Sequence, residues 1–332
     1  MTSFPPTPKV EGRKMSKSSV IYPLWKKVES FLAPIFRKIK AFFERYRRQS
    51  FAYPYIFWMA LFVVIPIILI GVYACTSAQG SFTLDNFSGM VDYAPVFGRS
   101  LWLAFLATAL CLLIGYPVAL AISRMNPKTQ RVLLMLIMLP MWINFLLRTY
   151  AWMSILENTG LINRLLATIG VFDWINGMHA ADPNYIPITH FQLINTDGAV
   201  VLGMVYNYLP FMILPIQSVI VKIDHFVIEA AEDLGANSRT VFRKVIFPLS
   251  LSGVISGITM VFVPAVSTFV ISKLLSNGTV MLLGDLIEMQ FTGAAYNPHL
   301  GSAISLIMMV IVIICMSVMN KFGEGEEQAV VM

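Results

Sequence analysis

Two carboxylates in an otherwise apolar stretch are the residues of this sequence best suited to chemistry. Asp285 and Glu288 lie three positions apart in the segment 282–291, LLGDLIEMQF, so they share one face of a helix. The segment is apolar enough to re-enter a membrane, where a carboxylate is costly unless it serves a function. The spacing therefore predicts a functional pair of acids at membrane depth.

Polar and aromatic side chains gather in two further apolar stretches. Tyr206, Asn207 and Tyr208 stand shortly before Pro210, and Asn144 and Arg148 lie in an earlier stretch. Tyrosines at this depth either anchor a helix at the membrane interface or line a path through it, and the neighbouring proline favours the path. The arginine is expected to extend its charged end to the outer interface.

The loop 157–198 between these stretches is acidic and aromatic. Its acids are Glu157, Asp173, Asp182 and Asp197, its one basic residue is Arg164, and Trp174, Tyr185 and Phe191 lie beside the acids. Such a surface favours an organic cation through charge pairing and cation–π contact. The alternative is a solvated loop whose acids merely follow the charge bias of outer loops. One short helix is expected, over Leu161–Ile169.

Other reactive residues lack the arrangement that catalysis or metal binding requires. The four histidines, at positions 179, 190, 225 and 299, do not have metal-ligand spacing. The three cysteines lie inside apolar runs, as small core residues do. The sequence contains neither a G-x-x-x-x-G-K-[ST] phosphate loop nor a nucleophile–base constellation. The chain is therefore predicted to be no enzyme, to hold no metal and to bind no cofactor itself.

Hydropathy predicts an all-α integral membrane protein. Hydrophobic residues make up 57% of the 332 and charged residues only 13%, far from the soluble average. Six stretches within 51–320 are long enough to span about 30 Å of hydrocarbon. They lie near 53–75, 100–123, 132–156, 199–221, 247–272 and 302–320. Gly253 and Gly257, a G-x-x-x-G pair in the fifth stretch, predict a close helix crossing.

Charges in the connecting loops predict the side on which each lies. Loops 124–131 and 222–246 are basic, which places them in the cytoplasm by the positive-inside rule. The acidic loop 157–198 then lies outside. Both termini, including the tail 321–332, are expected in the cytoplasm of a multi-pass protein of the cell membrane.

The first fifty residues form a separate basic region, with twelve of the 24 Lys and Arg residues against three acids. Residues 1–20 are rich in Pro, Ser and Lys and are predicted to be a disordered cytoplasmic tail. Residues 21–48 carry apolar and basic positions at helical spacing, which predicts an amphipathic helix lying on membrane lipid. Partner binding is an alternative for this helix. Nucleic-acid binding is disfavoured, because the basic residues lie opposite a regular apolar stripe.

A polar segment, 224–248, interrupts the apolar stretches with strong helical content. From Glu229 it reads EAAEDLGANSRTVFRKVIFP, which predicts two short helices meeting at Gly235. Glycine adopts the left-handed conformation at a helix end at little cost, and Ser238 is expected to cap the second helix. A helix–glycine–helix elbow on a membrane face suits docking into the groove of another protein.

This elbow resembles the coupling loop of ABC-importer permeases, whose pattern is E-A-A, three residues, G, nine residues, I-x-L-P. The matching residues are Glu229, Ala230, Ala231, Gly235 and Pro248, with Val245 and Phe247 in place of Ile and Leu. From about residue 51 the chain resembles the B-type permease of spermidine/putrescine importers. The segments that carry this resemblance are FTLDNF at 82–87, the W-x-N-x-L-x-R-x-Y stretch at 142–150, YNYLPFMILP at 206–215 and LLGDLIEMQF at 282–291. The first fifty residues are longer than usual for that family.

The resemblance implies the six-helix fold of a type I ABC importer permease and a set of partners. These are a second, unlike permease subunit, two ATP-binding subunits that hold ATP and Mg²⁺, and an extracellular or periplasmic polyamine-binding protein. Glu229 would pair with a basic residue of the ATPase, Gly235 would make the turn, and Ala230 and Ala231 would allow close approach.

A polyamine cargo, which the resemblance also implies, needs acids or aromatic faces along its route. The candidates are Asp285, Glu288, Tyr206, Trp142 and Tyr150. The nearer alternative is the same machine with another cargo, such as ferric iron, a phosphonate or an amino acid derivative. The further alternative is an ATP-independent channel or secondary carrier, against which the elbow argues.

Overall fold

The computed structural model describes residues 53–178, 186–293 and 296–330, and every named element in these ranges is a helix. The segments predicted as a disordered tail, 1–20, and as an amphipathic helix, 21–48, lie outside the described residues. The chain divides into two compact units, residues 1–68 and 69–332.

The first apolar stretch forms one continuous run of helix. α2 (Tyr53–Met59) and the π-helical η1 (Ala60–Val64) belong to the first unit, and α3 (Ile65–Ala74) continues the run into the second. In the most apolar window between Pro54 and Ala74 no residue is buried. A helix that is apolar on every side requires lipid or another protein around it.

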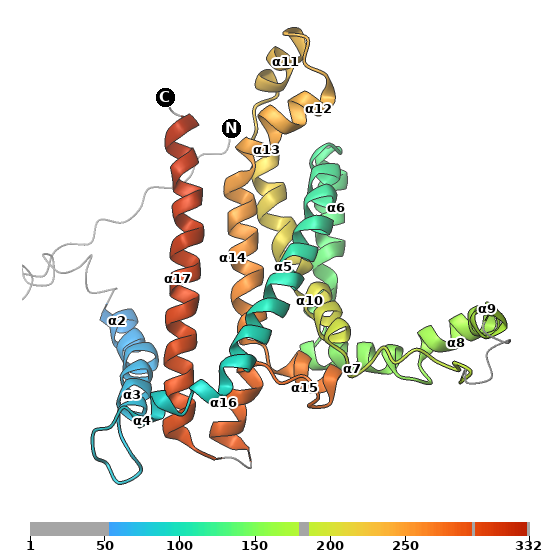
Figure 1. Ribbon diagram of the computed structural model, residues 1–332. Coiled ribbons are helices and arrows are strands. Elements are labelled where there is room, and N and C mark those ends of the chain that lie inside the picture. Colours follow the sequence, from blue (N-terminus) through green and yellow to red (C-terminus); the bar gives the residue numbers. More distant parts are fainter. Residues whose placement is uncertain (1–52, 179–185, 294–295, 331–332) are drawn as a thin grey trace, which may run out of the picture. The chain divides into compact units, whose positions relative to one another are not determined.

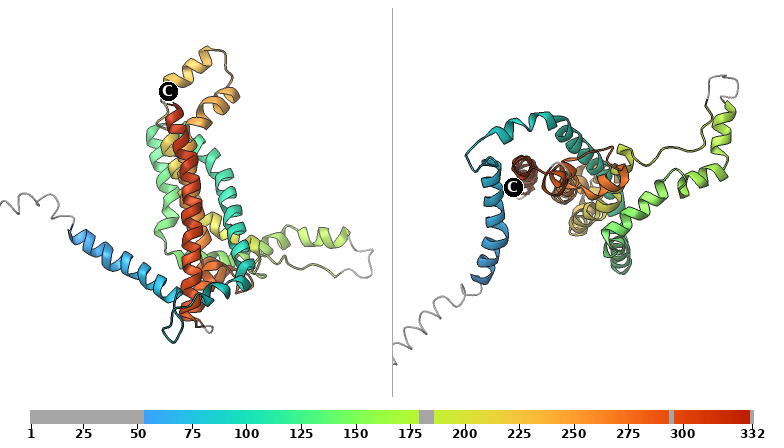
Figure 2. Two further views of the ribbon diagram at one scale, coloured as in Figure 1. Left: turned by 60° about the vertical axis from the view of Figure 1, so that its left-hand side comes forward. Right: turned by 90° about the horizontal axis from the view of Figure 1, so that it is seen from below.

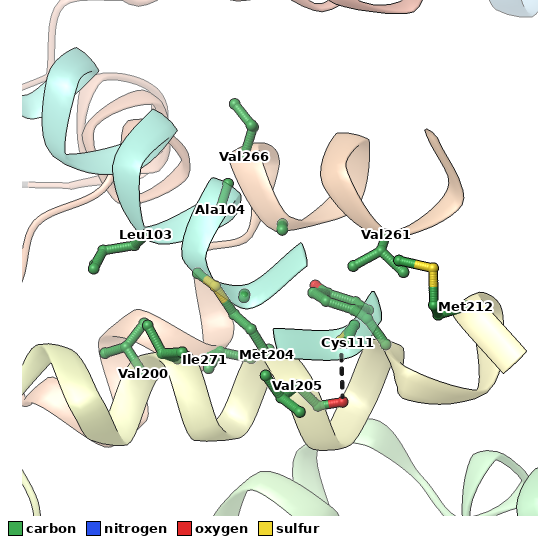
Figure 3. Packing of buried hydrophobic residues seen from close by; sticks show 14 of the residues in the cluster. Leu103, Ala104, Cys111, Val200, Met204, Val205, Met212, Val261, Val266 and Ile271 are labelled. Carbon is green, nitrogen blue, oxygen red and sulfur yellow. Dashed lines mark hydrogen bonds between the residues drawn. The ribbon is translucent and has the colours of Figure 1, made fainter. Parts of the chain in front are cut away.

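Three long helices form the core of the second unit, in which the end of α3 is followed by α4 (Asp85–Ser88) and η2 (Val91–Tyr93). They are α5 (Ala94–Ser123), α10 (Asp197–Ile220) and α14 (Leu251–Ser267), each packed against the other two, and α17 (Pro298–Val330) packs against α14 (Figure 1). Buried side chains such as Leu103, Met204, Met212 and Val261 fill the space between the three (Figure 3). The Cys111 thiol lies in the same layer and donates to the Val205 carbonyl at 3.8 Å (Figure 3).

The close helix crossing predicted from Gly253 and Gly257 is confirmed, and the helix crossed is α10. A Cβ on Gly253 would lie 2.9 Å from the Pro215 carbonyl oxygen, and one on Gly257 would lie 2.7 Å from the Met212 sulfur. Larger residues here would force α14 away from α10.

Four helices of the described part are long and apolar enough to cross a membrane, or up to six if two bent pairs each count as one span. The four are 54–74, 85–123, 197–220 and 298–319, and the bent pairs are 127–142 with 145–168, at 88°, and 238–249 with 251–267, at 60°. The single helices overlap four of the six stretches expected from hydropathy.

The third stretch differs from its expected form, a single helix over 132–156. The chain instead forms α6 (Pro127–Met138), η3 (Leu139–Trp142) and α7 (Phe145–Leu156), with the 88° bend between the last two. At the bend Ile143 and Asn144 leave helical geometry, and the Asn144 side chain accepts the Leu146 N–H at 2.8 Å. The two helices together are still apolar enough for one span, because Asn144 is a single polar residue, so hydropathy does not reveal a break made by a cap.

The loop 157–198 contains a second helix beyond the one expected. α8 (Leu161–Thr168) is followed by α9 (Val171–Met178), with Gly170 at φ +82° between them. Both extend sideways from the core of α5, α10 and α14 in all the views (Figures 1 and 2).

Short helices lie at the two ends of the core (Figure 1). At one end, here called the elbow end, are α11 (His225–Asp233), α12 (Ser238–Val241), the π-helical η4 (Phe242–Ile246) and α13 (Phe247–Leu249). At the other, the α16 end, are α15 (Val270–Ser276) and α16 (Leu283–Thr292). The fifth apolar stretch is expected as one helix over 247–272, but the structure divides it. Thr268 adopts an extended backbone, which ends α14 before α15 begins.

Candidate functional site

The first half of the elbow is a helix closed by glycine, as the sequence predicts. The Asp224 side chain accepts the Phe226 N–H at 3.0 Å and begins α11. Gly235 has φ +82°, in the left-handed region, and the Ala236 N–H then bonds back to the Ala231 carbonyl at 3.1 Å. This closure satisfies carbonyls that the helix end would leave unpaired.

The second half begins with a different cap from the one expected. The side-chain oxygen of Asn237 accepts both the N–H and the hydroxyl of Thr240, each at 2.9 Å. Ser238 is already the first helical residue of α12, so the prediction that it caps this helix is wrong. Asn237 takes the role because its own backbone is extended, which is the geometry of an N-cap.

The tip of the elbow exposes large apolar side chains. Phe226 is 75% exposed and Leu234 is 89% exposed, among exposed charged residues of the same segment. Glu229 and Ala230 are exposed beside them, and the Glu229 carboxylate contacts the His225 Nδ1 at 2.9 Å. Exposed apolar groups rimmed by polar ones mark a surface that another protein covers.

The base of the elbow is tied to α5 by a buried pair of hydroxyls. The Tyr116 hydroxyl lies 2.8 Å from the Ser250 Oγ, and Ser250 stands at the 60° bend between α13 and α14. Ser250 donates to the Phe247 carbonyl at 2.9 Å, which leaves Tyr116 as the donor of the pair. The Tyr116 ring also contacts those of Phe242 and Phe247, at 5.9 and 5.8 Å between centroids. Pro248 lies within this base, in α13.

At the α16 end, Asp285 is a buried cap. One carboxylate oxygen accepts the Leu282 N–H at 2.9 Å, and the side chain is only 9% exposed. The other oxygen has no hydrogen-bond partner among the described residues. Burial raises the pKa of this carboxyl above its usual range, and the nearby Ser272 hydroxyl and the Leu282 N–H oppose the rise.

Glu288 holds an ion pair instead. Both of its carboxylate oxygens lie 3.1 Å from the Lys273 ammonium, which comes from α15. Together with a hydrogen bond from Thr292, this contact lowers the pKa of Glu288. The sequence pattern that singled out the two acids gives no sign of Lys273, because the pairing spans 15 positions and two helices.

The α16 end is also fixed to distant parts of the chain. The Leu283 N–H donates to the Ser100 hydroxyl of α5 at 2.8 Å, and the Asn195 N–H donates to the Leu275 carbonyl at 2.9 Å. A Cβ on Gly284 would lie 2.5 Å from the Thr268 carbonyl oxygen. The acids are therefore held in a closely packed frame.

The three aromatic candidates lie on other elements. Trp142, in η3, is 71% exposed, and Tyr150, in α7, is 47% exposed. Tyr206, in α10, packs on Trp152 with ring centroids 5.3 Å apart. No hydrogen bond, ion pair or ring contact within the described ranges joins any of the three to Asp285 or Glu288. The described part also has no group of three or more His, Cys, Asp or Glu placed to hold a metal.

Residues 111–323 match the family described as the binding-protein-dependent transport system inner membrane component. This range covers most of the chain, including the whole elbow. The chain belongs to this family. The resemblance to a transport permease seen in the sequence is thereby confirmed, and the permease is a transport component of an inner membrane.

Curated relatives and solved structures agree with this assignment. The permease is 37% identical over 262 residues to the spermidine/putrescine transport system permease protein PotB of Haemophilus influenzae, covering 76% of this chain and 86% of the relative. It is 34% identical to PotB of Escherichia coli K12, covering 76% and 90%. A bacterial ABC transporter that imports alginate superposes with a TM-score of 0.70 at 14% identity, over 86% of this chain and 98% of the other. That likeness shows an ABC importer permease fold.

Proposed function

We propose that this chain is the membrane-spanning permease subunit of an ATP-driven importer of spermidine and putrescine, forming half of the translocation path. The observation that carries the proposal is the 34–37% identity to PotB over 262 residues. The exposed elbow supports it independently, because a channel or secondary carrier has no need of a docking surface for an ATPase.

The elbow is the contact with the ATPase in this proposal. Its exposed Phe226 and Leu234 enter the groove of an ATP-binding subunit, and Glu229 pairs with a basic residue there. Ala230 and Ala231 allow close approach, Gly235 makes the turn, and Pro248 begins the connection to the core. Two such subunits hold ATP and Mg²⁺, and this chain binds neither.

The proposal includes two further partners. A second, unlike permease subunit completes the path, and a polyamine-binding protein delivers cargo from outside the cell. One of the solved relatives, the alginate transporter, was determined in complex with its periplasmic binding protein. In this arrangement the chain crosses the membrane six times, with the elbow and both termini in the cytoplasm.

Acids and aromatic rings are the groups that a polyamine meets along its route. The proposed contacts are Asp285, Glu288, Tyr206, Trp142 and Tyr150. Glu288 supports the assignment by its chemistry, because it already accepts a primary alkylammonium group from Lys273 at 3.1 Å. Spermidine and putrescine end in the same group. Ferric iron, a phosphonate or an amino acid derivative remain the alternative cargoes of the same machine.

Uptake of labelled spermidine and putrescine tests the proposal. Cells that lack polyamine importers would receive this chain with the ATPase, second permease and binding protein encoded beside it. The variant Glu229→Ala is compared with Glu232→Ala, which removes another exposed acid of the same elbow. We expect uptake that requires ATP and is lost with Glu229→Ala but not with its control. An assembled complex that imports no polyamine would contradict the cargo and leave the family assignment intact.

A further inference from the structure

Arg148 carries a charge for which the described residues offer no counter-charge. Its Nε is buried and has no hydrogen-bond partner, and no carboxylate lies within ion-pair distance in the described ranges. The guanidinium carbon lies 5.9 Å from the centroid of the Phe145 ring. The side chain as a whole is partly exposed. Its Nε–H is nevertheless unfavourably placed, because a buried donor without an acceptor loses its hydrogen bond to water and gains none in return. The sequence prediction of an arginine extending freely to the interface does not explain this buried nitrogen.

A cavity of about 280 Å³ lies beside this arginine, between α7 and α10. Besides Arg148 it is lined by Trp152 and Tyr206 and by the aliphatic residues Ile143, Leu147, Ala151 and Ile155. The lining therefore supplies hydrocarbon and aromatic surface around a single fixed positive charge. This arrangement is complementary to a short side chain that ends in a carboxylate.

Large apolar side chains are exposed on the elements that carry the cavity. Leu147, which lines the cavity, is 64% exposed, and Trp142 of η3 and Tyr150 of α7 are 71% and 47% exposed. Arginine, tryptophan and tyrosine are the residues that dominate the centres of protein interfaces, where surrounding apolar contacts exclude water from the charged pair. The face formed by η3 and α7 around Arg148, here called the Arg148 face, has that composition.

We propose that the second permease subunit covers the Arg148 face and inserts a carboxylate side chain into the cavity to pair with Arg148. This inference rests on the two-subunit path of the proposed function. It also resolves a conflict within that function, because an unpaired guanidinium beside Tyr206 would repel a polycation. A side-chain carboxylate with one or two methylenes fits the cavity, whereas a lipid phosphate brings a glycerol backbone and two acyl chains.

Recovery of the second permease with the purified complex tests the pairing. We expect Arg148→Glu to lower recovery by about tenfold or more, since it puts like charges together in a desolvated pocket. Ala151→Phe keeps the charge but fills the cavity, and it should cause a similar loss. Arg164→Glu makes the same chemical change at an exposed position of α8 and should leave recovery unchanged. Replacing acids of the second permease by arginine, one at a time, should yield one variant that restores recovery with Arg148→Glu.

A photo-crosslinking residue, p-benzoylphenylalanine, placed at Ala151 identifies what enters the cavity. An adduct with the second permease is expected. An adduct with lipid alone, or full recovery with both Arg148→Glu and Ala151→Phe, would overturn the proposal. Size-exclusion profiles and thermal unfolding of the isolated chains separate lost pairing from misfolding. Failure of polyamine import by a fully assembled wild-type complex would contradict the cargo instead, because recovery is measured without cargo.

Discussion

The two ends of the core are built by opposite means. At the elbow end, the turn is closed by bonds within a few positions, such as Ala236 to Ala231 and Thr240 to Asn237, and its tip is exposed. At the α16 end, the Ser100 hydroxyl receives an N–H from 183 positions away, and the acids lie in packed surroundings. The exposed surface of the elbow is thus formed locally, while a fixed polar frame is assembled from the whole chain.

From this difference we expect the elbow to move as one piece while the far end keeps its geometry. The Tyr116–Ser250 hydrogen bond connects the locally formed elbow to the packed core, since it joins the base of the elbow to the core helix α5. Substitutions at each end should therefore fail in different ways. Those in the elbow should separate ATP hydrolysis from transport, and those near α16 should affect stability or cargo binding.

The largest effect is expected from Gly235→Val. Nothing lies within 4 Å of the Cβ position, so the added side chain meets no steric clash. The energetic cost comes from the backbone alone, because φ +82° is unfavourable for an L-residue by about 1–2 kcal/mol. The elbow should rearrange, and uptake should fall by about tenfold or more while ATP hydrolysis by the complex persists. Gly235→Asn is the control, because asparagine tolerates the left-handed region. Normal uptake by the valine variant would show that the turn does not carry the coupling.

Gly284→Ala should destabilise the α16 end by packing alone. The added methyl would lie 2.5 Å from the Thr268 carbonyl oxygen and 2.7 Å from that of Ser267, both of them backbone atoms that cannot rotate away. Such overpacking costs about 1–3 kcal/mol, which thermal unfolding in detergent can measure. Gly71→Ala, where no atom lies within 4 Å, should be neutral or slightly stabilising. Equal melting temperatures for the two variants would mean that α16 is less tightly held than described here.

The same contrast decides how much the sequence could predict. Apolar runs, the E-A-A and glycine pattern and the G-x-x-x-G pair depend on near neighbours. From them a helical membrane protein, the turn at Gly235 and a close crossing by α14 can be predicted, but not that α10 is the helix crossed. The choice between Asn237 and Ser238 as cap could not be made, because both residue types cap helices and only the backbone distinguishes them.

Features that depend on distant residues were out of reach. The bend after Trp142 is marked only by the single polar residue Asn144, which does not lower the hydropathy of the stretch enough to divide it. Lys273 follows the fifth apolar stretch as a lone lysine with no motif around it, yet it is the partner of Glu288. The buried nitrogen of Arg148 likewise becomes evident only when α7 and α10 are placed together.

Removing the hydroxyls that join the base of the elbow to α5 should have an intermediate effect on stability. Tyr116→Phe leaves Ser250 without its buried donor, and Ser250→Ala leaves the tyrosine hydroxyl unpaired, so each should cost about 1–2 kcal/mol. The double variant should cost less than the sum, because the second change removes a group that has already lost its partner. Thr108→Val is the matched control, since that buried hydroxyl bonds only within its own helix, to the Ala104 carbonyl. Additive losses would show that the two hydroxyls do not act as a pair.

The smallest change in stability, and the sharpest test of the α16 end, comes from the Lys273–Glu288 pair. Its side chains are 58% and 29% exposed, so either Lys273→Met or Glu288→Gln should alter the free energy of unfolding by less than about 1 kcal/mol. If the ion pair is purely structural, the two variants should also behave alike in uptake. If Glu288 binds cargo, the two variants should shift the KM for spermidine in opposite directions. Lys273→Met frees the carboxylate and lowers this KM, whereas Glu288→Gln removes the charge and raises it.

The control is another ion pair, because Arg99 and Asp197 form a comparably exposed pair at 2.7 Å. Arg99→Gln and Asp197→Asn should change the KM little and not in opposite directions. Opposite shifts of KM for the variants at 273 and 288, with no shift at 99 and 197, would identify Glu288 as an ammonium-binding site on the path. Parallel shifts of KM at 273 and 288 would show that the pair is a structural contact.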